Sequence, residues 1–131
     1  MVFQLNFNII KFIIRAMKGE FKYTEEKRLD EKYRITLPES YRIIIHEAET
    51  KWVMVPVRDK KMSLDVMTET AFRALEDDTS EKALKILGVP HHLDIDAEGR
   101  IMLPKEFRRF FPGNKVRIVG AGDYFCIDPI Y

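Results

Sequence analysis

The sequence predicts an α+β protein made of two related small units, and three observations lead to this fold class. The segment Asp30–Arg42 recurs without gaps as Asp96–Arg108, 66 positions later. Self-similarity at a fixed offset outranks local propensity as a guide to architecture. Runs rich in β-branched residues occur at 51–57 and 115–120, and apolar residues at helical spacing occupy the region 64–87 between the copies. The chain is therefore expected to form two β-rich units joined by helices.

Each copy of the repeat has the order Asp-x-x-x-Arg, Ile-x-Leu-Pro and then an aromatic residue followed by Arg. In the second copy, Asp96 can accept a backbone N–H and Gly99 can take a positive φ, which predicts a tight turn. Arg100 then begins a short strand, and Pro104 ends that strand because it cannot donate to a ladder. Proline also suits the first position of a helical turn. The motif thus predicts a turn, a strand and a short helix, with a cation at the turn.

The first copy differs from the second at one position of this turn. Tyr33 stands where Gly99 stands in the second copy. Tyrosine is disfavoured at positive φ, so we expect the first turn to have an altered geometry and Arg34 to be presented differently from Arg100. A single Asp-x-x-x-Arg is most simply a local ion pair, but two matched copies favour a pair of contact points.

The other elements of the first unit follow from local patterns. Residues 21–23 are expected to form its first strand, and residues 43–45 to be buried. The run 51–57 is the third strand, with Trp52 in the core rather than stacked on a partner. A turn at 59–61 leads to residues 62–64, which close the unit.

Two helices and the strands of the second unit come next. The first helix is predicted over 64–75 from its apolar spacing. The second helix begins after Thr79, which can cap it, and ends at Gly88. In the second unit, strands are expected over 91–96, 115–120 and 124–127.

The predicted organisation has four parts. Residues 1–16 are an N-terminal extension, 17–64 the first unit, 65–88 the linking helices and 89–131 the second unit. The apolar part of the extension is shorter than the roughly 20 residues that cross a membrane. It also lacks the charged start of a secretory signal. We therefore expect a cytoplasmic protein that has no membrane partner.

Composition fits a soluble globular chain, with 46% hydrophobic and 33% charged residues among 131. The net charge of +1 argues against a strongly electrostatic nucleic-acid binder. Basic residues nevertheless gather in and around the two copies, whereas the segment 65–81 between them is acidic. Such a distribution can build one basic face, although composition alone equally fits ordinary solvated surfaces.

Catalytic and metal-binding patterns are weak. Cys126 is the only cysteine, which excludes an intrachain disulfide and a cysteine-based zinc site. His91 and His92 are adjacent in a predicted strand and point to opposite faces, so they cannot easily chelate together. No nucleophile–base pair stands out. We expect a binding protein, not an enzyme, with no cofactor and no metal.

The doubled motif resembles the MraZ family, within the wider AbrB-like group of swapped-hairpin transcription regulators. The matching features are Asp30 with Arg34, Asp96 with Arg100, the two Leu-Pro-x-x-aromatic-Arg segments, Lys85–Gly88, Val119–Phe125 and a family-like start at Met17–Phe21. Together they cover the chain from Met17 to Asp128.

This resemblance implies both a fold and a function. The fold would be two AbrB-like β-hairpin units interleaved into a double-psi/swapped-hairpin barrel, with two linking helices. The function would be sequence-specific binding of double-stranded DNA by a ring-like homo-oligomer. Its targets would be direct repeats upstream of the division and cell-wall gene cluster, and the protein would be nucleoid-associated.

Nine residues are the candidate DNA contacts. Arg34 and Arg100 would bind guanine in the major groove, and Asp30 and Asp96 would orient them. Candidate phosphate contacts, which set position and salt dependence, are Arg28, Lys32, Arg42, Lys105 and Arg108. An alternative remains open, namely an AbrB-like antitoxin or protein-interaction module without specific DNA binding.

Overall fold

The computed structural model describes residues 20–48, 50–58, 61–77, 83–86 and 88–130. The predicted extension, residues 1–16, lies outside the described residues. The described elements are β1 (Thr24–Arg28), β2 (Arg34–Thr36), α2 (Glu39–Glu47), β3 (Trp52–Arg58), β4 (Met62–Thr68), α3 (Glu69–Glu76), the 3-10 helix η1 (Ala83–Lys85), β5 (His91–His92), β6 (Arg100–Met102), the 3-10 helix η2 (Lys105–Phe110), β7 (Lys115–Gly120) and β8 (Phe125–Pro129). The protein is therefore α+β, with antiparallel strands and few helices, as predicted.

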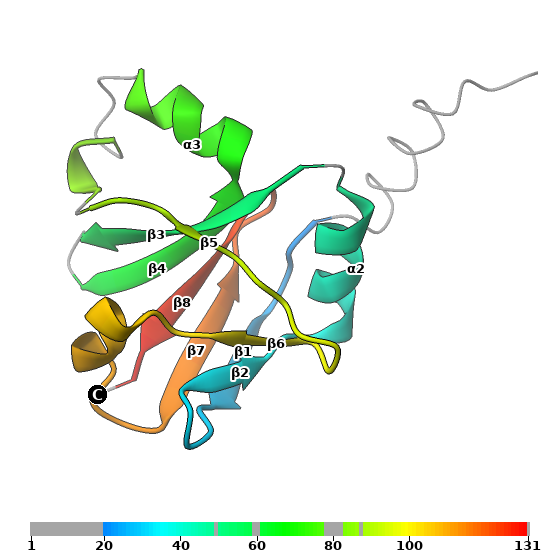
Figure 1. The fold of residues 1–131 in the computed structure, drawn as a ribbon, viewed down its shortest axis with the longest axis vertical. Coiled ribbons are helices and arrows are strands. Elements are labelled where there is room, and N and C mark those ends of the chain that lie inside the picture. Colours follow the sequence, from blue (N-terminus) through cyan, green and yellow to red (C-terminus); the bar gives the residue numbers. More distant parts are fainter. Residues whose placement is uncertain (1–19, 49, 59–60, 78–82, 87, 131) are drawn as a thin grey trace, which may run out of the picture.

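Strands from the first half of the chain pair with strands from the second half. Six strands form one sheet in the order β1-β7-β8-β4-β3-β5, and β2 and β6 form a separate two-stranded ribbon (Figure 1). The ladders β1·β7, β2·β6, β3·β5 and β4·β8 each join a strand from residues 24–68 to a strand from residues 91–129. In this order β1 mirrors β5, β7 mirrors β3 and β8 mirrors β4. The sheet is therefore approximately twofold symmetric about a point between β8 and β4.

The predicted closed barrel is not seen among the described strands. The sheet has β1 and β5 at its edges, and among the described strands β2 and β6 pair only with each other. Each ribbon strand is three residues long. β2 is followed by Leu37 and Pro38, and β6 by Leu103 and Pro104. Each proline lies directly before a helix, α2 or η2, as expected. Strands this short do not link the two edges of the sheet.

The ribbon is anchored by apolar side chains that repeat at the same positions in both copies. Ile35 and Ile101 are 0% and 1% exposed, and Leu37 and Leu103 are equally buried. They belong to one hydrophobic cluster with residues of the large sheet, including Ile118. Complete burial of one such side chain contributes about 1.5–3 kcal/mol. The inner face of the ribbon is therefore firmly attached to the sheet.

An aromatic cluster joins the two copies in the core. The ring of Phe21 makes edge contacts with Tyr41, Trp52 and Phe125 at centroid distances of 4.8, 5.6 and 4.9 Å. The predicted core position of Trp52 is confirmed. The predicted strand at 21–23 is wrong, because Tyr23 has a φ of 73° and interrupts the extended backbone. Phe21 forms only an isolated bridge with Gly122.

The first linking helix begins later than predicted. Leu64 and Val66 belong to β4, which pairs with β3 on one side and β8 on the other. Met62, Leu64 and Val66 alternate with polar Ser63 and Asp65, which is the period of a strand, but Val66 and Met67 also fit the helical spacing that continues to Ala71. The helix α3 begins after Thr68, whose hydroxyl accepts a hydrogen bond from the Ala71 N–H at 3.1 Å.

The region of the second predicted helix is only partly described. Residues 78–82 and 87 lie outside the described residues. The described part is the single turn η1 and Ile86, which forms a β-bridge with Val57 and so is not α-helical. The predicted strand over 91–96 is also shorter, since only His91 and His92 pair with β3. Among the described helices, none has the length and apolar character needed to cross a membrane.

Candidate nucleic-acid interface

The two Asp-x-x-x-Arg turns are built by the same hydrogen bonds. In the first copy, Asp30 Oδ1 accepts the N–H groups of Lys32 and Arg34 at 2.9 and 2.8 Å. In the second copy, Asp96 Oδ1 accepts the corresponding N–H groups of Glu98 and Arg100, both at 2.9 Å. Each aspartate therefore fixes the backbone of its own turn.

The expectation that Tyr33 alters the first turn is wrong. Tyr33 has a φ of 59° and Gly99 a φ of 77°, so both residues are left-handed. The N–H of each donates to the carbonyl of its aspartate, Asp30 or Asp96, at 3.0 Å. The left-handed penalty of a non-glycine residue is roughly 1–2 kcal/mol, which the hydrogen bonds of the turn are strong enough to offset.

Each arginine is held by its own aspartate. The Nε atom of Arg34 lies 2.6 Å from Asp30 Oδ2, and the Nε atom of Arg100 lies 2.7 Å from Asp96 Oδ2. The two arginine side chains are 25% and 27% exposed. Pairing through Nε leaves the outer end of a guanidinium as the part that can meet a ligand.

Both arginines lie on the same face of the ribbon. In the β2–β6 register, Arg34 is opposite Met102, Thr36 is opposite Arg100, and Ile35 is opposite Ile101. Directly opposed residues share a face, so the buried isoleucines are on the inner face and the arginines on the outer one. Diagonal neighbours of this kind lie about 7–8 Å apart. The ribbon thus presents two matched cations side by side.

Sequence reasoning missed Thr36 and Met102, which complete this outer face. Both are exposed, and Met102 is 48% exposed although it is apolar. The signal was present in the sequence. In Arg-Ile-Thr and Arg-Ile-Met the residue two positions after each arginine falls on the arginine's face, because side chains in a strand alternate with a period of two.

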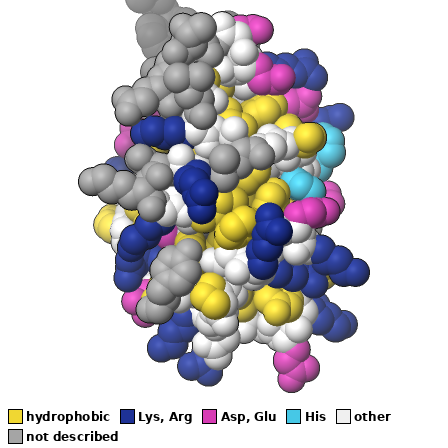
Figure 2. All heavy atoms as spheres, turned by 90° about the vertical axis from the view of Figure 1, so that its left-hand side faces the viewer, with side chains coloured by type: hydrophobic (Ala, Val, Ile, Leu, Met, Phe, Trp, Pro, Cys, Tyr) yellow, Lys and Arg dark blue, Asp and Glu magenta, His cyan; other side chains and the backbone are white. Residues whose placement is uncertain are grey.

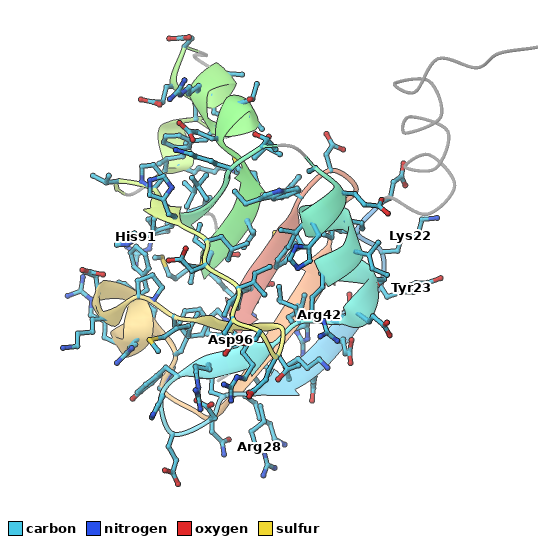
Figure 3. The ribbon with its side chains drawn as sticks, turned by 45° about the vertical axis from the view of Figure 1, so that its right-hand side comes forward. Lys22, Tyr23, Arg28, Arg42, His91 and Asp96 are labelled. Atoms are coloured by element: carbon cyan, nitrogen blue, oxygen red, sulfur yellow. The ribbon has the colours of Figure 1, made fainter. Side chains whose placement is uncertain are left out.

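The last arginine of each copy packs against the turn of the other copy. Arg42 extends from α2 over Gly99 toward the turn that holds Asp96 (Figure 3), and a Cβ added at Gly99 would lie 2.3 Å from Arg42 Cδ. Arg108 of η2 lies over the Tyr33 ring at 4.6 Å and donates from Nε to the Leu103 carbonyl at 3.1 Å. Both candidate phosphate contacts therefore also support a turn.

The remaining candidate phosphate contacts are more exposed. Arg28 ends β1 and extends away from the body of the molecule (Figure 3). Lys32 is exposed within the first turn, and Lys105 is exposed at the start of η2. On the side where η2 lies, Lys and Arg side chains surround an apolar area (Figure 2). Eight of the nine candidates thus lie on the ribbon, its turns and the adjoining helices, and Arg28 lies at the end of β1.

His91 contacts an aromatic ring and lies near a carboxylate. The His91 ring contacts Phe107 edge-on at 5.0 Å, and its Nε2 lies 3.8 Å from Glu106 Oε2. Cys126 is half-buried in β8. No three His, Cys, Asp or Glu side chains gather as a metal site in the parts of the chain that are described.

The turns shift the pKa values of their charged groups. Partial burial raises the pKa of Asp30, but hydrogen bonds from Arg34 and Lys32 outweigh this, so its pKa lies below 3.8. The backbone hydrogen bond from Arg100 lowers the pKa of Asp96 in the same way. The hydrogen bond to Asp96 raises the pKa of Arg100. Asp30, Asp96 and Arg100 are therefore charged at neutral pH.

The lowered pKa values predict a loss of stability in acid. A carboxyl group whose folded pKa is depressed stabilises the fold above its unfolded pKa, near 3.9, and this is lost as pH falls through the folded value. We expect the double variant Asp30→Asn, Asp96→Asn to show a weaker decline in unfolding free energy below about pH 4 than wild type. Urea unfolding across a pH series measures this.

The exposed Asp123→Asn variant serves as the control for this measurement, because Asp123 lies outside both turns. It should keep the acid dependence of wild type. If the double variant and wild type lost stability in parallel, the two aspartates would not be the groups that shift.

The comparisons with known proteins agree with the motif. No family model matches the chain. A curated protein of Shewanella loihica named "Transcriptional regulator MraZ" is 29% identical over an alignment of 100 residues, which covers 69% of this chain and 66% of that protein. The aligned part thus spans just under two thirds of the relative's length. The resemblance to MraZ regulators indicated by the doubled motif is borne out by this similarity.

Proposed function

We propose that this protein is a sequence-specific DNA-binding transcriptional regulator. The supporting observation is the β2–β6 ribbon, whose outer face carries Arg34 and Arg100, each oriented by its own aspartate. A two-stranded ribbon fits the major groove of B-DNA, and arginine can donate two hydrogen bonds to guanine O6 and N7. The similarity to a transcriptional regulator favours the same function.

The charges around the ribbon support a modest affinity for each chain. Arg28, Lys32, Arg42, Lys105 and Arg108 are the proposed phosphate contacts, and the basic side chains near η2 extend this surface (Figure 2). Glu31 and Glu98 lie in the same turns and oppose phosphate. Modest affinity is compensated when several linked chains bind repeated sites. We therefore propose a ring-like homo-oligomer on direct repeats upstream of the division and cell-wall gene cluster, acting at the nucleoid in the cytoplasm.

The proposed architecture is the interleaved swapped-hairpin arrangement of AbrB-like proteins. The four ladders that join strands of different copies favour it. We keep the division into units 17–64 and 89–131, joined by 65–88, as part of this proposal. The strand β4 crosses the boundary at residue 64, since it continues to Thr68.

The test is fluorescence anisotropy with the DNA immediately upstream of this protein's own gene and with scrambled DNA, over a salt series. Wild type should prefer the upstream DNA. Arg34→Ala and Arg100→Ala should each weaken specific binding, by up to about 1–3 kcal/mol for a complete bidentate contact, and reduce the preference. The two substitutions remove outer-face side chains, so the fold should be retained.

Lys61→Ala is the matched control, because Lys61 is an exposed cation outside the ribbon and its turns. It should leave the preference for upstream DNA unchanged. Equal affinity for both DNAs, with no effect of either arginine, would contradict the proposal. Such a result would favour a protein-interaction module instead.

A further inference from the structure

The two turns are alike in backbone but differ in charge at their third position. Lys32 in the first turn corresponds to Glu98 in the second. Residues 30–34 carry two acidic and two basic side chains, whereas residues 96–100 carry two acidic and one basic. The first turn is therefore the more cationic of the two, although it is the copy that lacks the glycine.

This difference changes how much of each guanidinium is occupied. Arg34 forms its side-chain ion pair through Nε with Asp30 alone. Arg100 pairs through Nε with Asp96 and also through Nη2 with Glu98 Oε2, at 2.6 Å. Within the described residues, Arg34 keeps both Nη groups without an ion-pair partner, and Arg100 keeps only one.

A bidentate contact with guanine needs two N–H groups at one edge of the guanidinium. Arg34 can offer its outer edge, formed by Nη1 and Nη2, without breaking the bond to Asp30. At the same edge of Arg100, Nη2 already pairs with Glu98, so guanine must compete with this carboxylate. Glu98 is 68% exposed, so it can move, but its carboxylate then lies close to the incoming DNA and is repelled by phosphate.

We propose that the first turn carries most of the specific DNA contact and that Glu98 is a specificity-determining residue that weakens the second turn. This inference rests on the proposed function. The two turns of each chain would thus contact DNA unequally, with the stronger contact at Arg34 and the weaker one at Arg100.

The inference predicts the effect of Glu98→Gln, which keeps the side-chain shape and removes its charge. This variant should bind the upstream DNA about 5-fold or more tightly than wild type, which corresponds to the lower end of the value of a bidentate contact. In wild type, Arg34→Ala should weaken binding at least about 5-fold more than Arg100→Ala. In the Glu98→Gln background, the loss caused by Arg100→Ala should increase.

Glu31→Gln is the matched control, because it removes the same charge from the other turn, and Glu31 makes no ion pair within the described part of the chain. It should tighten binding less than Glu98→Gln does. Equal gains from the two substitutions, or equal losses from the two arginine variants, would overturn the inference while leaving the proposed function intact. Absence of any preference for upstream DNA in wild type would overturn both.

Discussion

Truncation of Phe21 to alanine is expected to lower the free energy of unfolding by about 3–5 kcal/mol, the usual loss for a buried phenylalanine. Phe21 is 1% exposed and contacts three aromatic rings, those of Tyr41 and Trp52 in the first unit and that of Phe125 in the second unit. Its removal leaves a cavity at the point where the two copies meet. Native domains are stable by only about 5–15 kcal/mol, so the midpoint of thermal unfolding should fall by roughly 10 °C or more.

The segment that carries Phe21 is held without a regular strand, which makes this prediction informative. Phe21 exchanges backbone hydrogen bonds with Gly122 at 2.8 and 3.1 Å. The Tyr41 hydroxyl donates to the Lys22 carbonyl at 2.8 Å, and burial raises the pKa of this hydroxyl. Phe21 is therefore positioned from both copies.

Urea unfolding followed by circular dichroism measures the loss, and Tyr23→Ala is the control. Tyr23 lies two residues away and is 84% exposed, so its truncation should change stability by less than about 0.5 kcal/mol. A loss below about 1 kcal/mol for Phe21→Ala would mean that the aromatic cluster does not hold the copies together.

The ribbon could be predicted from the sequence because its causes are local. The alternation in Arg-Ile-Thr and Arg-Ile-Met, and the proline that follows each, determine the face of each side chain and the end of each strand. The repeat then places the two strands in equivalent positions. The pairing of β2 with β6 is not predicted, because no local pattern determines it.

The support of the turns could not be predicted in this way. Arg42 lies against Gly99 and Arg108 against Tyr33, and these residues are far apart in the chain. Their contacts exist only once β2 has paired with β6. For the same reason, the sequence does not reveal that Arg108 lies over the Tyr33 ring. The prediction of an altered first turn is therefore wrong.

The start of α3 shows a second kind of limit. Leu64 and Val66 are both fully buried in β4 and alternate with polar Ser63 and Asp65, but Val66 and Met67 also begin the helical spacing that continues to Leu75. Periodicity alone does not distinguish a strand buried on both faces from a buried helix. The neighbours of β4, namely β3 and β8, decide the outcome.

The second large effect is expected from Gly99→Ala, because Gly99 is required twice. An alanine at its φ of 77° incurs a left-handed penalty that is part of the roughly 1–3 kcal/mol typical of strained positions. Its Cβ would also collide with Cδ and Nη1 of Arg42, so the flexible end of this side chain must shift, at a smaller further cost. Unfolding free energy should fall by both costs.

A double-mutant cycle with Arg42→Ala separates these two costs. In the Arg42→Ala background the collision is absent, so Gly99→Ala should cost less than it does in wild type, by roughly 0.5 kcal/mol or more. Strictly additive losses would show that Arg42 does not pack over Gly99. Urea unfolding of the four proteins gives the coupling directly.

The corresponding change in the first turn, Tyr33→Gly, should behave differently. It relieves the left-handed penalty of about 1–2 kcal/mol and removes the contact between the Tyr33 ring and Arg108, a kind of interaction worth about 0.5–1 kcal/mol when exposed. The two effects oppose each other, so stability should change little. The contrast follows from the way each turn is covered. An arginine packed on bare backbone requires glycine at position 99, whereas an arginine stacked on a ring lets the first copy keep tyrosine and the same left-handed turn.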